Sequence, residues 1–262
     1  MRMKILVIAA AFLAGISTAH ASAEKIELPG IDWSWKGPFG GFDKAQLQRG
    51  LQVYTEVCAT CHSLNLMAYR NLAALGYNED EVKAYAANYE VEDGPNDEGE
   101  MFTRAALPSD RFVPPFPNDN AARASNNGAY PPDLSLMTKA RKNGTNYLYG
   151  MMTGYSEEIP EIYPDDPEKK FELMEGMSYH KYFTGHQTAM PQPLYGDDVE
   201  YADGTEATLE QEAKDVTAFL AWSAEPELEE RKAMGIKVLL FLGVLFVMVV
   251  AVKKAVWRNV HH

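Results

Sequence analysis

The sequence predicts a mainly α-helical protein with long loops and one transmembrane helix near its C-terminus. Apolar residues recur at helical spacing in two segments that lie far apart, 43–54 and 208–220. A third apolar segment, the 18 residues 235–252, is long enough to cross a bilayer. Between the two helical segments, the prolines of residues 108–132 predict a loop in place of another helix.

The N-terminus has the pattern of a bacterial export signal. Basic residues precede an apolar run at 5–16, and small residues follow, with cleavage positions after Ala21 or Ala23. The alternative is an uncleaved anchor, which the shortness of the apolar run disfavours. We therefore expect residues 1–23 to be removed and the body of the protein to lie in the periplasm.

The first helix of the body is expected to begin at Asp43. Gln46 follows three residues later, which is the spacing of a capping box. Leu47, Leu51 and Tyr54 then lie on one apolar face of the helix. This helix runs directly toward the only two cysteines of the chain.

The two cysteines lie in Cys58-Ala59-Thr60-Cys61-His62, called here the haem motif, which is the C-x-x-C-H signature of c-type haem attachment. Two thiols one helical turn apart can add to the two vinyl groups of a haem, and the next histidine can bind its iron. A thioredoxin-like redox pair needs a βαβ context, and a zinc site needs more ligands than lie nearby. The single motif therefore predicts one covalent haem, with the 108–132 loop wrapped around it. A helix that leads into this motif resembles the start of class I cytochromes c.

Met190 is the strongest candidate for the second axial ligand of the iron. Pro191 and Pro193 stiffen the backbone there, so the segment can hold a weakly binding thioether in place. Methionine–histidine ligation raises the reduction potential relative to two histidines. Core packing is the ordinary role of a methionine, and His186 is the rival ligand. His180 is expected at the surface or at the rim of the site.

Further helices are expected downstream of the haem motif. Helical patterns run over three shorter stretches, 79–89, 134–141 and 146–152. Thr208 and Gln211 have the spacing of a capping box, and the helix that follows is expected to pack across the first one.

The C-terminal segment is expected to anchor the protein in a membrane. The run 235–252 is apolar apart from Lys237, which lies near one end and can reach the headgroups. Pro226 predicts a break before this helix, or its first turn. A buried core helix is the weaker alternative. We therefore expect a haem domain at 24–226 and an anchor with a cytoplasmic tail at 227–262.

The chain is acidic, with 37 acidic and 24 basic residues and a net charge of −13. Nucleic acid is an unfavourable partner for such a surface, and a basic protein is a favourable one. The acidic residues gather at 90–100 and 157–175. Solvated loops are the simpler explanation of each cluster. For the surface as a whole, we expect a field that steers a basic protein partner over about 10 Å.

Longer blocks of the sequence point to one family. They include Gln48-Arg49-Gly50-Leu51-Gln52-Val53-Tyr54, Asn126-Asn127-Gly128-Ala129-Tyr130-Pro131-Pro132-Asp133-Leu134-Ser135, Thr153-Gly154-Tyr155, Ala189-Met190-Pro191 and Asp203-Gly204-Thr205. With these blocks the chain resembles, over nearly all of its mature length, the bacterial members of the cytochrome c1 family. That family supplies the haem-bearing subunit of the cytochrome bc1 complex.

The resemblance implies roles for individual residues. Cys58 and Cys61 would hold a haem c, with His62 and Met190 as axial ligands of the iron. Four further residues would lie around the haem and its propionates: Asn126, Pro132, Arg141 and Tyr147. A guanidinium can bind a propionate through two hydrogen bonds, although Arg141 can also be an ordinary surface residue.

The resemblance also implies a function. The chain would pass one electron from a Rieske iron–sulfur subunit to a cytochrome c, inside a quinol–cytochrome c oxidoreductase that also contains cytochrome b and is dimeric. It would not be catalytic alone, since no nucleophile–base arrangement is visible. Two alternatives remain open: a free-standing membrane-anchored cytochrome that serves a terminal oxidase, and a haem enzyme or gas sensor with an open sixth position on the iron.

Overall fold

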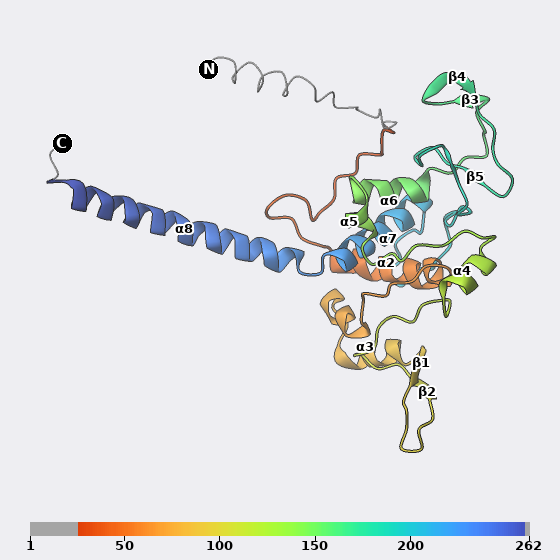
Figure 1. Ribbon diagram of the computed structural model, residues 1–262, viewed down its shortest axis with the longest axis horizontal. Helices are drawn as coiled ribbons and strands as arrows, with labels where there is room; N and C mark the ends of the chain where they lie inside the picture. Colours follow the sequence, from red (N-terminus) through yellow and green to blue (C-terminus); the bar gives the residue numbers. More distant parts are fainter. Residues whose placement is uncertain (1–25, 260–262) are drawn as a thin grey trace, which may run out of the picture.

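The computed structural model describes residues 26–259, which form a helical body and one long projecting helix (Figure 1). The helices are α2 (Lys44–Glu56), η1 (Cys58–Thr60), η2 (Tyr69–Leu75), α3 (Glu79–Ala86), α4 (Asp119–Ser125), α5 (Met137–Ala140), α6 (Gly144–Thr153), α7 (Leu209–Ala224) and α8 (Leu228–Trp257). The expected export signal lies outside the described residues. The predicted mainly helical class is confirmed.

The core is built on the crossing of α2 and α7. Gly50 of α2 lies so close to α7 that a Cβ atom there would approach the carbonyl oxygen of Asp215 to 2.0 Å. Next to this contact, the ring centroids of Tyr54 and Phe219 are 5.6 Å apart. The residues of the predicted apolar face of α2 are all buried: Leu47, Leu51 and Tyr54. The prediction that these two helices pack across each other is confirmed.

Charged and polar side chains of α2 also bind α7 at this crossing. The Arg49 guanidinium lies 2.8 Å from the buried carboxylate of Asp215 and 2.7 Å from Asp203. Gln46 also donates to Asp215, at 3.1 Å. Asp43 caps α2 by accepting from the backbone N–H of Gln46. The expected capping box is therefore only half correct, because the Gln46 side chain binds α7 and does not return to the cap.

The other helices follow the predicted order with different ends. Helix α3 begins at Glu79 as predicted but stops at Ala86, because the chain turns there into a strand. Helix α5 is shorter than the predicted stretch 134–141 and lies within it. Helix α6 contains the predicted stretch 146–152 and extends past it at both ends. Thr208 caps α7 by accepting from the backbone N–H of Gln211 at 3.2 Å.

The expectation of a loop throughout residues 108–132 is wrong for its middle part. Helix α4 forms there, capped by Asn118, whose side chain accepts from the N–H of Ala121 at 3.0 Å. The seven residues of α4 contain no proline, so nothing in the backbone prevents a short helix. The segments on both sides of α4 remain irregular.

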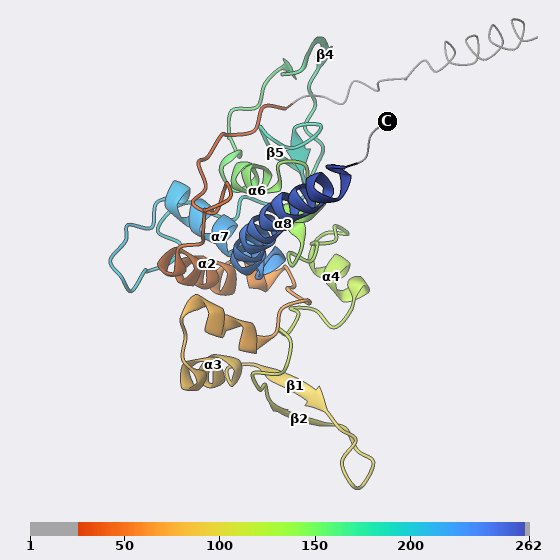
Figure 2. The same cartoon turned by 90° about the vertical axis from the view of Figure 1, so that its left-hand side faces the viewer.

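The described residues also form antiparallel hairpins that the sequence patterns do not predict. These are β1 (Glu90–Asp93) with β2 (Phe102–Ala105), β3 (Ile162–Tyr163) with β4 (Asp166–Lys170), and β5 (Ser178–Tyr179) with β6 (Gln187–Thr188). The β1–β2 hairpin carries the first acidic cluster and projects from the body (Figure 2). At its base Arg104 pairs with Asp93 and, at 2.6 Å, with Asp110.

Helix α8 contains the predicted span 235–252 and extends away from the body (Figure 1). Within residues 26–259 it is the one helix that is long and apolar enough to cross a membrane, and its apolar side chains are exposed. The predicted break is confirmed, since Pro226 lies between the end of α7 and the start of α8. Glu225 at this break pairs with Arg231 of α8 at 2.6 Å.

Candidate functional site

The haem motif lies where α2 ends and the chain makes the single turn of η1. The backbone N–H groups of Cys61 and His62 both donate to the carbonyl of Cys58, at 3.1 and 2.9 Å. This turn brings the two thiols and the imidazole together at the end of one helix. Both thiols are free and half-buried, so they are available for thioether bonds.

The imidazole of His62 is oriented by the backbone of Pro132. Its Nδ1 atom lies 2.8 Å from the Pro132 carbonyl oxygen, which can only accept a hydrogen bond. Nδ1 therefore carries the proton, and Nε2 presents a lone pair. Metal-binding histidines are commonly held in this way by a hydrogen bond from the other ring nitrogen. Burial lowers the pKa of His62 and so favours the neutral imidazole that binds iron.

The segment that contains Pro132 is itself tied to the haem motif. The carboxylate of Asp133 accepts from the Ser63 hydroxyl at 2.8 Å and from the Asn65 backbone N–H at 2.7 Å. The N–H of Leu134 donates to the carbonyl of Ser63 at 2.9 Å. These bonds fix the Pro132 carbonyl, and the orientation of the imidazole follows from them.

The surroundings of Cys58 favour the thiol over the thiolate. Burial raises the pKa of Cys58 to about 12, with a smaller contribution from Cys61. Because the thiolate is the form that oxidises and exchanges disulfides, the folded site disfavours both side reactions.

Met190 lies in a segment whose backbone is held at two points. Its N–H donates to the Thr188 hydroxyl at 3.2 Å, and the Tyr155 hydroxyl donates to its carbonyl at 3.0 Å. The side chain is half-buried against the hydrophobic core. Within residues 26–259 the thioether sulfur takes part in no hydrogen bond. The backbone is thus fixed while the sulfur stays available.

The two histidines considered as alternatives are both used inside the protein. His186, the rival ligand, is buried, and its Nε2 atom lies 2.6 Å from the carboxylate of Asp165. His180 is fully buried, so its expected position at the surface or rim is wrong. The cause is that both of its ring nitrogens have backbone partners, the Met151 carbonyl at 3.1 Å and the Tyr182 N–H at 3.2 Å.

Three other predicted site residues have partners away from the haem motif. The Asn126 side chain donates to the carbonyl of Ala122 at 2.7 Å and closes the end of α4. The Arg141 guanidinium is exposed and lies 5.8 Å from the centroid of the Tyr147 ring. In the described part of the chain, none of the three donates to or accepts from the haem motif, whereas Pro132 does.

Tyr155, Thr188 and Asp133 are site residues that the sequence does not reveal. They bind the backbones of Met190 and Asn65 and the hydroxyl of Ser63, and those contacts depend on the fold. Tyr155 and Asp133 do lie within the family blocks, which was the one available signal.

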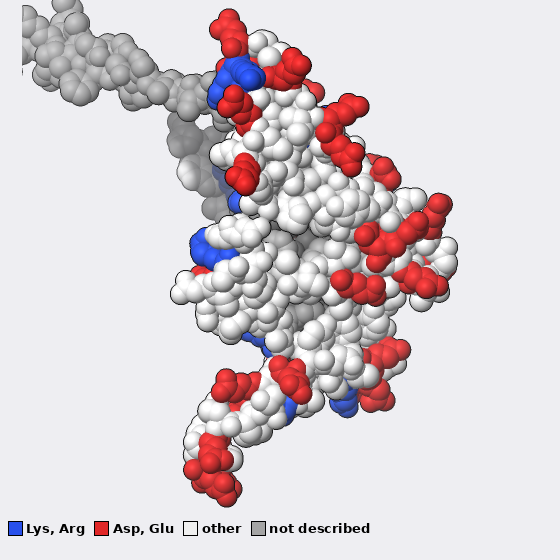
Figure 3. Space-filling model, turned by 90° about the vertical axis from the view of Figure 1, so that its right-hand side faces the viewer, with Lys and Arg blue, Asp and Glu red and all other residues white. Residues whose placement is uncertain are grey.

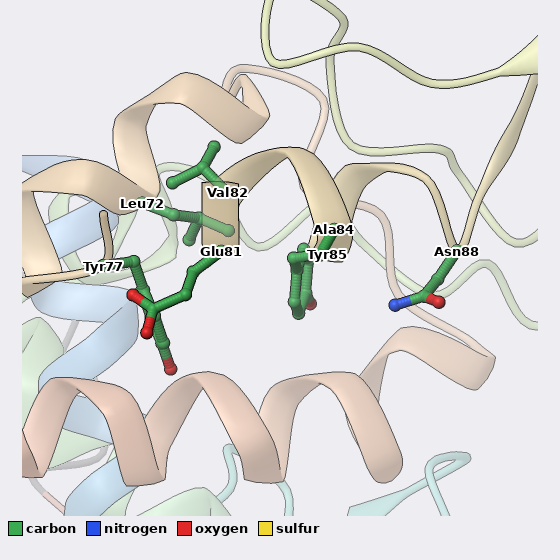
Figure 4. Close-up of a pocket in the computed structure, with 7 residues that line it drawn as sticks. All are labelled: Leu72, Tyr77, Glu81, Val82, Ala84, Tyr85 and Asn88. Atoms are coloured by element: carbon green, nitrogen blue, oxygen red, sulfur yellow. The ribbon is translucent and has the colours of Figure 1, made fainter. Parts of the chain in front are cut away.

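The residues present fit a covalently bound haem: two free thiols, an imidazole with one nitrogen already held, and a thioether on a fixed backbone. The face opposite α8 is hollowed near its middle, with most acidic side chains on the right, upper and lower parts of the face and a basic patch at its left edge (Figure 3). A separate pocket of about 410 Å³ lies beside α3 (Figure 4). Leu72, Tyr77 and Tyr85 line it, and none of its lining residues is a cysteine, histidine or methionine, so it lacks the residue types of a c-type haem site.

Comparisons with known proteins point to one family. The sequence model described as "Cytochrome C1 family" matches residues 33–260. Cytochrome c1 of Rhodospirillum rubrum is 49% identical over 266 residues, which cover 99% of this chain and 98% of that protein. A mitochondrial cytochrome c1 of Solanum tuberosum is 47% identical, with 93% and 90% covered. Cytochrome b/c1 of Bradyrhizobium diazoefficiens is 45% identical over 96% of this chain and 39% of its own length.

Proposed function

The chain belongs to the cytochrome c1 family, the haem-bearing electron-transfer subunits of the cytochrome bc1 complex, and on this premise we propose that it carries one covalent haem c. It accepts one electron from a Rieske iron–sulfur subunit and passes it to a cytochrome c. The haem iron supplies the redox chemistry by cycling between its ferrous and ferric states. The protein supplies covalent attachment, axial ligands and a docking surface.

Cys58 and Cys61 form the thioether bonds, and His62 and Met190 are the axial ligands. The observation that carries this proposal is the 2.8 Å contact between His62 Nδ1 and the Pro132 carbonyl, because it leaves Nε2 to bind a metal. Met190 is favoured over His186 because the Nε2 atom of His186 is already occupied by Asp165. The haem domain then has the arrangement of a class I cytochrome c, in which α2 leads into the haem motif and α7 packs across α2.

Arg141 is proposed as a partner of a haem propionate. Its guanidinium is exposed and forms no ion pair with a carboxylate among residues 26–259, so its charge is available to an anionic group. Tyr147 positions it through the cation–π contact at 5.8 Å. Asn126 and Pro132 complete the surroundings of the haem in this proposal.

The location follows from the two ends of the chain. Residues 1–23 are an export signal, 24–226 form the periplasmic haem domain, and 227–262 anchor it in the bacterial inner membrane with a cytoplasmic tail. Cytochrome b and the Rieske protein are the partners inside a dimeric complex. A basic cytochrome c is the acceptor, which the acidic side chains of the face in Figure 3 support.

Copurification tests the place of the chain in the complex. Solubilised in a mild detergent, the chain is expected to remain bound to a cytochrome b and a Rieske protein, with a single c-type haem spectrum. Loss of both partners under conditions that preserve the haem would favour a free-standing cytochrome that serves a terminal oxidase.

Replacing Met190 with Leu tests the axial ligand. The Met190→Leu protein is expected to show a large fall in reduction potential and to bind carbon monoxide when reduced, whereas the wild-type protein binds none at neutral pH. Ready binding of carbon monoxide by the wild-type protein would show an open sixth position and would refute the Met190 assignment.

A further inference from the structure

The segment 36–41, Lys36-Gly37-Pro38-Phe39-Gly40-Gly41, forms a turn at the base of α8 that we call the Phe39 turn. Phe39 is 85% exposed, while the next most exposed large apolar side chain of residues 26–259, Leu239 of α8, is 71% exposed. Single exposed apolar residues are common on protein surfaces. The exposure of Phe39 alone therefore does not indicate a binding site. The position of the Phe39 turn beside α8 is the further observation that indicates one.

The Phe39 turn has a fixed shape that keeps Phe39 outside. Trp35 before the turn and Phe42 after it stack on each other, with ring centroids 4.9 Å apart. At Gly40 a Cβ atom would lie 2.1 Å from the carbonyl oxygen of Lys36, so the turn closes more tightly than any other residue allows. The stack below the turn is already formed without Phe39, whose ring stays in the solvent.

The Phe39 turn is bound to the first two turns of α8. The Lys232 ammonium group donates to the carbonyls of Trp35 and Gly40, at 2.5 and 2.9 Å. The backbone N–H of Phe42 donates to the Glu229 carboxylate at 2.6 Å. Three hydrogen bonds to charged groups thus hold the turn at a fixed height along the helix.

That height spans the headgroup region of a bilayer and its outer edge, with Lys232 inside the region and Glu229 at the edge. Lys232 precedes the apolar span 235–252 by three residues and Glu229 by six, which places them about 4.5 and about 9 Å outside it along the helix axis. The headgroup layer on each side of a bilayer is about 5–8 Å thick. In Figure 1, the red-brown N-terminal segment loops out on the side from which α8 departs. The exposed ring belongs to the turn that is held beside this part of α8.

We propose that the Phe39 turn is a second membrane contact, in which the Phe39 ring enters the boundary between the headgroups and acyl chains of the phospholipids around α8. An apolar ring gains free energy by leaving water at this boundary. Together with α8, the contact fixes the tilt of the haem domain relative to the membrane. This inference rests on the proposed membrane anchor, and it adds lipid as a direct partner of the haem domain.

Photocrosslinking in native membranes tests the proposal. Phe39 is replaced by p-benzoylphenylalanine in the full-length chain within its complex, and the irradiated subunit is weighed by mass spectrometry. Because Phe39 is exposed and outside the haem site, the haem spectrum is expected to be unchanged. The expected result is an adduct that adds the mass of one phospholipid. The matched control is the same substitution at Met101, which is exposed in the projecting hairpin and is expected to give no lipid adduct.

Two other outcomes would overturn the proposal. A crosslink from position 39 to another protein subunit would show that the turn contacts protein, and no adduct of either kind would show that it faces water. Extraction with alkaline carbonate separates these failures from failure of the anchor. A chain that stays in the membrane without a lipid adduct at position 39 refutes only the second contact, whereas an extracted chain refutes the anchor itself.

Discussion

Glu212 of α7 is a buried carboxyl group whose replacement should change the pH dependence of stability. Its Oε1 atom accepts from the backbone N–H groups of Asp198 and Val199, at 2.9 and 3.3 Å, in the segment that follows Met190. Its Oε2 atom has no hydrogen-bond partner within residues 26–259. Burial, with the Asp198 side chain nearby, raises the pKa of Glu212 from 4.5 to about 7.

The size and sign of the effect follow from this raised pKa. Below pH 4.5 the carboxyl group of Glu212 is protonated in both the folded and the unfolded chain, so its ionisation does not change the free energy of unfolding. Between pH 4.5 and 7 only the folded chain keeps the proton of Glu212, so stability falls as the pH rises. One pKa unit corresponds to about 1.4 kcal/mol. The ionised carboxylate therefore destabilises the fold by up to about 3 kcal/mol above pH 7.

Glu212→Gln removes the ionisation and keeps an oxygen that can accept from both backbone N–H groups. Guanidinium unfolding of the detergent-solubilised chain, followed by haem absorbance, is measured from pH 4.5 to 8. The free energy of unfolding of the variant minus that of the wild type is expected to rise by up to about 3 kcal/mol over this range. Glu210→Gln, on the exposed side of the same helix, should give a flat difference. A flat difference for Glu212→Gln would refute the reasoning.

Other substitutions test the crossing and the ligand segment. Gly50→Ala pushes a Cβ against α7 and should lower the free energy of unfolding by about 1–3 kcal/mol, with a matching fall in Tm. Arg49→Met strips Asp215 of its guanidinium and should cost about 3 kcal/mol in the same assay. Tyr155→Phe removes the hydrogen bond to the Met190 carbonyl; we expect a loss of about 1 kcal/mol and weaker methionine ligation, seen as a lower reduction potential. An unchanged value would contradict the role assigned to that residue.

The parts of the site that depend on local spacing could be predicted from the sequence. The two thiols and the imidazole of the haem motif are brought together by one turn of chain, so their order along the sequence fixes their order in space. The apolar faces of α2 and α7 repeat at helical spacing and become buried as predicted. The family resemblance is confirmed by the comparisons.

The parts that depend on distant contacts could not be predicted. The burial of His180 depends on the fold, because its Nε2 atom lies 3.1 Å from the carbonyl of Met151 in α6, which is 29 residues away; its other ring contact, with the N–H of Tyr182, is local. The β1–β2 hairpin is made of largely polar residues, so no apolar alternation marks its strands. Tyr155 acts on Met190, 35 residues away, through a backbone carbonyl that any residue type possesses.

Helix α7 is the element that relates the haem site to the membrane. It meets α2 at Gly50, directly before the haem motif, and it holds the segment after Met190 through Glu212. At its other end, Glu225 pairs with Arg231 of α8. Helix α7 thus contacts the helix that leads into the haem motif, the segment after Met190 and the first turn of α8. The proposed lipid contact of the Phe39 turn would hold the body at a second point beside α8, because Lys232 and Glu229 tie this turn to α8.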